Sequence, residues 1–182
     1  KTISSDSVIG TGSVRRQLQI KAKYGCKCKD IRGNVPTRLK KLDDGEYDGI
    51  ILARAGLDRL DMIDIDKYNY EFFETLDFVP APCQGIIAVE NRADDEYIRD
   101  VLKAINHMET YVCFVAERAF LKAMDSGCQT PLGAISEIGE NNLKMECFYY
   151  KDRIVKMSIE GENPVLTAAV LAKKLKEVTN EG

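Results

Sequence analysis

The sequence predicts a doubly wound α/β domain followed by a small α+β domain. In the first 60 residues, short apolar runs alternate with helix signals, a pattern typical of parallel sheets joined by helices. From about residue 109 onward, one long helix pattern precedes three strand patterns and a closing helix. The 182 residues are enough to bury a real core, as one large domain or two small ones.

The predicted first domain begins with a strand and a capped helix. A short apolar strand ends at Gly10, and Ser13 can cap a helix over residues 14–24. Gly25 supplies the stop signal for this helix. Residues 26–31 then form the second predicted strand.

The next segments repeat this alternation. Pro36 is suited to the first turn of a short helix that ends near residue 43. Residues 48–53 (DGIILA) form a continuous apolar run, as expected of a strand buried in a parallel sheet. Gly56 opens another short helix. The resulting order is βαβαβα.

The second half contains other elements. Residues 61–83 are irregular, acidic and aromatic, which indicates a connection out of the first domain. Ile86–Val89 is a further buried-strand run. The remaining patterns predict helices at 95–106, 109–125 and 164–178, and strands at 132–138, 143–149 and 153–160.

Charge is distributed unevenly along the chain. The formal net charge is −3, but residues 1–60 carry 13 Lys+Arg and 7 Asp+Glu, a net charge of +6. This first third also holds six of the ten arginines, which favours an anionic ligand. No apolar run approaches the length of a membrane span, and the N-terminus lacks a signal-peptide pattern, so we expect no membrane role.

Six cysteines occur in the sequence, and we expect them to be reduced thiols of a cytoplasmic protein. The spacing of Cys26 and Cys28 is poor for a metal site, so no metal is predicted. Cys128 follows the long helix in a tight loop (SGCQTP). On pattern alone, a buried inert thiol is the favoured interpretation of Cys128, as it is of Cys113 and Cys147.

Three strand-to-helix turns carry arginines. They contain Ser13, Arg15 and Arg16; Arg32 and Arg38; and Arg54, Gly56 and Arg59. Carboxyl ends of parallel strands share one sheet edge, where open α/β sheets bind ligands, so the three turns together predict a site for a multiply anionic ligand. Each turn taken alone is equally explained as a helix start with solvated arginines, and Arg54 and Lys27 are left out of the site.

Taken together, these segments resemble the hydroxymethylbilane synthase (porphobilinogen deaminase) family. The matching strings are IGTGSVRRQLQ, DIRGNVPTRLKKLDDGEYDGIILARAGLDRL, PAPCQGIIAVENR and TYVCFVAERAFLKAMDSGCQTPLGA. The resemblance implies three domains, two of them like type II periplasmic binding proteins. It assigns residues 1–83 to domain two, 84–107 to a hinge with a strand and helix returning to domain one, and 108–182 to domain three. Most of domain one is then absent.

The resemblance also implies an activity and a site. The family condenses four porphobilinogen molecules head to tail with loss of ammonia, on a dipyrromethane cofactor bound through a cysteine thioether. Cys128 matches this cysteine, and one cofactor per chain is expected. The matching cofactor contacts are Ser13, Arg15, Arg16, Arg32, Arg38 and Gly56, and the matching substrate contacts are Arg15, Arg32, Arg38 and Arg59.

Departures from the family pattern limit this expectation. Gly12 stands where a serine is frequent, so one hydroxyl contact is lost, and Pro82 with Cys83 replaces a more flexible pair before the hinge. The proton-handling aspartate belongs to domain one, so this chain alone is expected to be inactive. We expect the full-length protein to be a monomer and the exposed edges of Ile86–Val89 to promote self-association of the fragment.

Two alternatives to the enzyme remain open. A non-catalytic anion-binding module of the periplasmic-binding type would use the arginine turns but would give Cys128 no role. A nucleic-acid binder would use the basic first third, but the sequence lacks exposed aromatics interleaved with the basic residues and any known binding motif.

Overall fold

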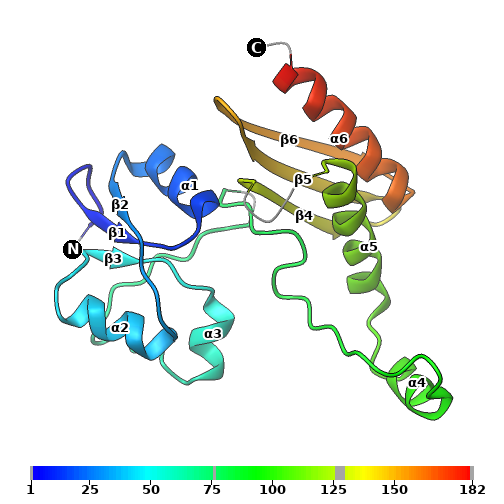
Figure 1. The fold of residues 1–182 in the computed structure, drawn as a ribbon, viewed down its shortest axis with the longest axis horizontal. Coiled ribbons are helices and arrows are strands. Elements are labelled where there is room, and N and C mark those ends of the chain that lie inside the picture. Colours follow the sequence, from blue (N-terminus) through cyan, green and yellow to red (C-terminus); the bar gives the residue numbers. More distant parts are fainter. Residues whose placement is uncertain (1, 76, 126–129, 181–182) are drawn as a thin grey trace. The chain divides into compact units, whose positions relative to one another are not determined.

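The computed structural model describes residues 2–75, 77–125 and 130–180. The chain divides into two compact units, Lys1–Phe78 and Val79–Gly182 (Figure 1). Cys128, the residue predicted to bind the cofactor, lies outside the described residues. No helix in the described part of the chain is long and apolar enough to cross a membrane.

The N-terminal unit alternates strands and helices as predicted. Its elements are β1 (Val8–Gly10), α1 (Val14–Tyr24), β2 (Lys27–Lys29), α2 (Val35–Asp43), β3 (Gly49–Ile50) and α3 (Arg54–Arg59). The three strands are parallel, in the order β2-β1-β3. Because α1 leads to one side of β1 and α2 leads back to the other, right-handed crossovers place these two helices on opposite faces of the sheet.

Local signals explain the helix limits in this unit. The Ser13 hydroxyl accepts a hydrogen bond from the Arg16 N–H, and Gly25 ends α1 with a φ of 65°. Asn34 caps α2, and Pro36 lies in its first turn. The strand predicted over 48–53 is shorter, since only Gly49 and Ile50 pair in the ladder. The predicted βαβαβα order is confirmed.

The irregular segment after α3 belongs to the N-terminal unit. Phe73 and Phe78 stack with their ring centroids 4.7 Å apart and pack against the small core around Ile9 and Ile20. Lys67 Nζ lies 2.8 Å from Asp43 Oδ2, so this segment is also fastened to the end of α2.

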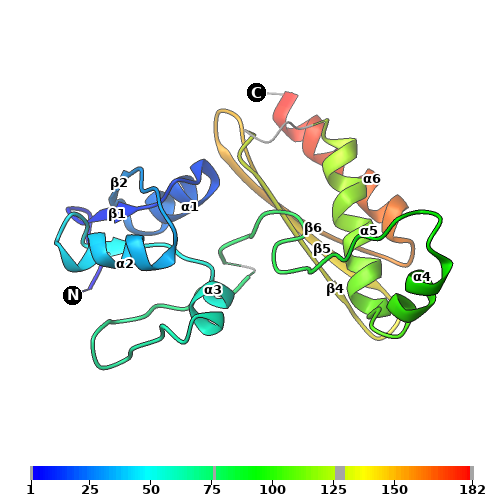
Figure 2. The ribbon, with the colours of Figure 1, turned by 60° about the horizontal axis from the view of Figure 1, so that its bottom comes forward.

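The C-terminal unit is built on an antiparallel sheet. Strands β4 (Leu132–Ile138), β5 (Leu143–Tyr150) and β6 (Ile154–Gly161) pair in sequence order. Helices α5 (Met108–Ala123) and α6 (Pro164–Asn180) lie side by side along this sheet (Figure 2). The buried core between them includes Phe120, Met145 and Leu171, each fully buried. The three strands and both helices were predicted from the sequence.

One predicted strand is not formed within the described residues. Ile86–Val89 forms no ladder with any described residue, and Ile87 and Val89 are 73% and 58% exposed. A strand needs a neighbouring strand to satisfy its backbone groups, and the described chain offers none here. The following helix α4 (Glu96–Lys103) is capped by the side chain of Asp95, which accepts from the Ile98 N–H, but none of its residues is buried.

Candidate functional site

The three arginine-bearing turns leave the same edge of the parallel sheet. Gly10, the last residue of β1, is in register with Lys29 at the end of β2 and with Ile50 at the end of β3. Just beyond the strands, the Thr11 N–H donates to Lys29 O at 3.1 Å, and the Ile51 N–H donates to Gly10 O at 3.0 Å. The chain therefore turns into each helix from one common edge, as the sequence predicted.

The first turn carries two arginines of different exposure. Arg15 is buried, with 8% of its surface exposed, whereas Arg16 is half-buried and its Nη1 donates to Ile51 O at 3.4 Å. Burial, and then the charge of Arg16, lower the pKa of Arg15 to about 10. Burial, and then the charge of Arg38, lower the pKa of Arg16. Both guanidinium groups remain protonated at neutral pH.

The second turn orients two arginines through their Nε atoms. Arg32 Nε donates to Asp30 Oδ2 at 2.9 Å, and Arg38 Nε donates to Gly33 O at 2.7 Å. Gly33 has a φ of 121°, a backbone conformation that residues other than glycine rarely adopt. With Nε engaged, each guanidinium still presents its paired Nη groups, which match the two oxygens of a carboxylate.

Close approaches bring the first turn to the second. A Cβ added to Gly12 would lie 2.9 Å from Asp30 Oδ1 and 3.2 Å from Ile31 O, so the first turn passes close to the second. Arg16 and Arg38 are close enough for the charge of Arg38 to lower the pKa of Arg16. A cluster of like charges of this kind is favourable only where an anion is bound or solvent screens it.

The third turn adjoins the second and adds fewer contacts. A Cβ added to Gly56 would meet Val35 Cγ2 at 3.6 Å, which places the start of α3 beside that of α2. Arg59 is exposed at the last position of α3. Arg54 pairs with Asp58 at 3.4 Å, and its guanidinium lies 4.9 Å from the centre of the Phe72 ring. Arg54 thus has local partners, in keeping with its omission from the predicted site.

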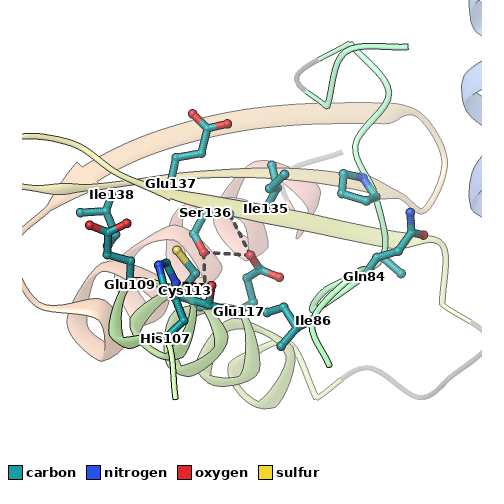
Figure 3. Close-up of a pocket in the computed structure, with 13 residues that line it drawn as sticks. Gln84, Ile86, His107, Glu109, Cys113, Glu117, Ile135, Ser136, Glu137 and Ile138 are labelled. Carbon is teal, nitrogen blue, oxygen red and sulfur yellow. Dashed lines mark hydrogen bonds between the residues drawn. The ribbon is translucent and has the colours of Figure 1, made fainter. Parts of the chain in front are cut away.

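The C-terminal unit contains a pocket that sequence reasoning did not find. It has a volume of about 360 Å³ and lies between the first half of α5, strand β4 and the segment Pro80–Ile86 (Figure 3). Its floor is formed by Glu117, which is 4% exposed and accepts hydrogen bonds from Ser136 and Cys83. Burial raises the pKa of Glu117, while these hydrogen bonds oppose the rise.

A signal for Glu117 was present in the sequence. Cys113, Ala116, Glu117 and Phe120 recur at the spacing of one helix face, and the other three are apolar. A carboxylate on such a face must be buried and hydrogen-bonded, or the helix must present that face to solvent. Among the described residues, no group of three or more His, Cys, Asp or Glu is arranged to hold a metal ion.

Comparisons with known proteins concern both halves of the chain. A family model described as porphobilinogen deaminase, dipyromethane cofactor binding domain, matches residues 1–100. A second, described as porphobilinogen deaminase, C-terminal domain, matches residues 111–179.

Similar curated relatives carry the same name. The porphobilinogen deaminase of Coxiella burnetii (strain RSA 493) is 45% identical over 145 residues, which cover 79% of this chain and 46% of the relative. That of Nostoc sp. (strain PCC 7120) is 42% identical over 165 residues, 90% of this chain and 48% of the relative. That of Ruminiclostridium josui is 39% identical over 174 residues, 92% of this chain and 58% of the relative. The chain spans about half the length of the curated relatives it matches.

Proposed function

The chain belongs to the porphobilinogen deaminase family, and on that premise we propose that it forms part of a hydroxymethylbilane synthase. This enzyme is a transferase of tetrapyrrole (porphyrin and haem) biosynthesis, which joins four porphobilinogen molecules head to tail with release of ammonia. In this proposal the N-terminal unit binds the carboxylates of the cofactor and the growing chain, and the C-terminal unit carries the cofactor cysteine.

The clustered arginines at one edge of the parallel sheet carry this proposal. Arg16 and Arg38 are mutually close, and Arg32 adjoins the first turn at Gly12. Each pyrrole ring of the substrate bears an acetate and a propionate, so several fixed cations are needed in one place. Guanidinium groups suit this task because each can hold a carboxylate with two parallel hydrogen bonds.

The proposed roles follow from how each side chain is held. Arg32 and Arg38 are oriented through Nε and bind carboxylates through their Nη groups. Arg15, at 8% exposure, holds its charge in a place where water screens it little, so its attraction for an anion is strong. The Ser13 hydroxyl and the Gly56 N–H are further donors, and Arg59 supplies an exposed cation for the substrate.

The dipyrromethane cofactor fits the arginine-lined edge because its carboxylates match the clustered cations. When bound, the cofactor supplies the pyrrole end to which substrate units are added. We propose that Cys128 holds it by a thioether, since a thiolate is a strong nucleophile toward an electrophilic methylene and the product bond resists hydrolysis.

Other properties expected from the sequence stay predictions. They are the periplasmic-binding-protein-like (type II) fold of the N-terminal unit, the three domain assignments, the cytoplasmic location and a monomeric full-length protein. The exposed Ile87 and Val89 support the expected self-association of this chain. Light scattering over a range of concentrations tests it, and a monomer throughout would contradict it.

Mass spectrometry of the full-length protein is the decisive experiment. We expect an excess equal to two linked pyrrole units on the peptide that contains Cys128, and a red colour in acidic aldehyde reagent. A Cys128→Ser variant should show neither signal, whereas Cys113→Ser should keep both. An unmodified Cys128 in the active full-length protein would contradict the proposed thioether.

The proposal separates the full-length protein from these 182 residues. In the family, the proton-handling aspartate belongs to a domain that these residues do not include, so we propose that the purified 182-residue chain forms no hydroxymethylbilane from porphobilinogen. Detection of that product would contradict this part of the proposal. The alternative, a non-catalytic anion-binding module, predicts carboxylate binding with no modification of Cys128 and no turnover by the full-length protein.

A further inference from the structure

A buried carboxylate joins three segments of the C-terminal unit that lie far apart in the sequence. Glu117 is on α5, and its oxygens receive hydrogen bonds from Ser136 on β4 (Figure 3) and from the turn at Cys83. With 4% of its surface exposed, the carboxylate is nearly closed off from water. Buried charges of this kind persist only where hydrogen bonds replace their hydration.

The contacts of Glu117 divide between its two oxygens. Oε1 accepts from the Ser136 N–H at 2.9 Å and from the Ser136 hydroxyl at 2.8 Å, while Oε2 accepts from the Cys83 N–H. The first two bonds tie β4 to α5, and the third ties the turn to the same carboxylate. Because β4 is an edge strand, the outward N–H of Ser136 would otherwise need a different acceptor.

The turn at Cys83 has a backbone conformation that needs such support. Cys83 has a φ of 61°, which is unfavourable for a residue with a side chain. The backbone bonds of the turn include one from the Ile86 N–H to Cys83 O at 3.2 Å, which spans only three residues. The Glu117 bond reaches Cys83 from 34 positions away and so ties this residue, with its positive φ, to α5.

The residues just before this turn lie alongside β4. Val79 is 1% exposed, and Pro80 O accepts from the Ala134 N–H at 3.1 Å. A Cβ on Gly133 would lie 2.7 Å from Pro80 O, so glycine is required where the two segments pass. Glu117 thus secures the far end of a segment that already covers the outer edge of β4.

We propose that Glu117 is a positioning residue that fastens the turn at residues 81–85 to α5 and β4. The inference deepens the proposed function, because this turn contains the predicted hinge and β4 follows the segment that carries Cys128. The hinge is consequently anchored to the part of the chain that is proposed to hold the cofactor. The Cys83 turn and β4 are both hydrogen-bonded to the buried carboxylate of Glu117.

Hydrogen–deuterium exchange of the 182-residue chain tests this role in a Glu117→Gln variant. The glutamine oxygen can still accept from Ser136, but its NH₂ group then faces the Cys83 N–H, so donor meets donor. We expect peptides covering residues 81–86 to exchange about tenfold faster, the size expected from loss of a hydrogen bond to a charged group. Glu109→Gln, an exposed residue on the same helix and pocket, is the matched control and should change nothing.

Cysteine labelling distinguishes a loosened turn from a general loss of packing. In Glu117→Gln we expect iodoacetamide to modify Cys83 several-fold faster, while Cys147, which is 1% exposed in the core, stays unmodified. Acceleration at both cysteines would assign Glu117 to core stability alone and overturn the proposal. Unchanged exchange at 81–86 in a folded variant would overturn it as well.

Ser136→Ala keeps the test valid if Glu117→Gln does not fold. It removes one of the three donors but leaves the Cys83 bond, so β4 peptides should exchange faster while residues 81–86 change less; equal acceleration of both would contradict the proposal. These outcomes are independent of the proposed function. If that function is wrong, Cys128 carries no pyrrole mass in wild type or variant of the full-length protein, whereas the exchange results remain interpretable.

Discussion

The two units differ in how much of their sheet is devoted to packing. The strands of the N-terminal unit have 3, 3 and 2 residues, whereas those of the C-terminal unit have 7, 8 and 8. The main buried cluster of the N-terminal unit contains three residues, and that of the C-terminal unit contains thirteen. Apolar burial is the main source of folding stability, so we infer that the C-terminal unit is the more stable of the two.

If the proposed function is right, binding and stability are assigned to different parts of this chain. The N-terminal unit ends its strands early and uses the turns that follow to gather arginines, at the expense of ladder hydrogen bonds. The C-terminal unit continues its strands and fills the space under two helices. Its buried charge, Glu117, joins segments of its own unit, whereas the N-terminal charges are proposed to bind an anionic ligand.

Removing a core aromatic side chain tests the comparison most strongly. Phe120→Ala, at a fully buried position of α5, should lower the free energy of unfolding of the C-terminal unit by about 3–5 kcal/mol, because it leaves a cavity. Hydrogen exchange measured peptide by peptide should show this loss in residues 108–180. Equal loss of protection in residues 2–75 would break the distinction between the units.

A glycine substitution gives the next largest effect. Gly133→Ala should destabilise the C-terminal unit by about 1–3 kcal/mol, since its Cβ would lie 2.7 Å from Pro80 O, a backbone atom that cannot easily move. Gly56→Ala is the contrasting variant, because its nearest neighbour would be Val35 Cγ2 at 3.6 Å. Urea denaturation should separate the two; a comparable destabilisation by Gly56→Ala would contradict the difference in available space.

An arginine substitution should affect binding without affecting stability. Arg38→Gln removes one guanidinium from the cluster, and we expect the full-length protein to bind porphobilinogen about tenfold more weakly, as for loss of a charge-assisted hydrogen bond. The melting temperature should stay close to that of wild type. Arg54→Gln is the matched control, an exposed arginine of the adjacent turn already paired with Asp58, and should leave affinity unchanged. Equal weakening by both would favour a diffuse charge effect.

The smallest effect concerns pH. Burial raises the pKa of Glu117 above its ordinary value of 4.5. Between the ordinary pKa of the unfolded state and the raised pKa of the native state, the native state binds a proton that the unfolded state does not. Wild type should therefore gain stability relative to Glu117→Gln as pH falls, and lose that gain as pH rises through the raised value. Urea denaturation of both proteins between pH 8 and pH 4.5 measures the difference. A constant difference would show that Glu117 titrates normally.

Local sequence signals were sufficient for most elements. Helix α1 begins after Ser13 and ends at Gly25 as expected, and Asp95 caps α4, because caps and left-handed glycines act within one turn of the chain. The alternation of apolar residues placed β4, β5 and β6 within one or two residues of their limits. The convergence of the arginine turns followed from topology, since parallel strands share one carboxyl edge.

Two features could not be predicted from the sequence because they depend on non-local contacts. The run at Ile86–Val89 has the composition of a buried strand, but composition cannot supply the neighbouring strand that a ladder requires. Glu117 looked like an ordinary helix residue because its partners, Cys83 and Ser136, lie 34 and 19 positions away.

The sequence by itself thus determined the order of the elements, their caps, the family and the set of arginines available for anions, because these depend on short-range chemistry and on recognisable strings. Only the tertiary structure decided that Arg15 is buried while Arg32 is exposed, that Gly12 lies close to Asp30, and that Glu117 joins three segments. Burial and hydrogen bonding depend on residues brought together from distant positions, and no local pattern encodes the distance between them.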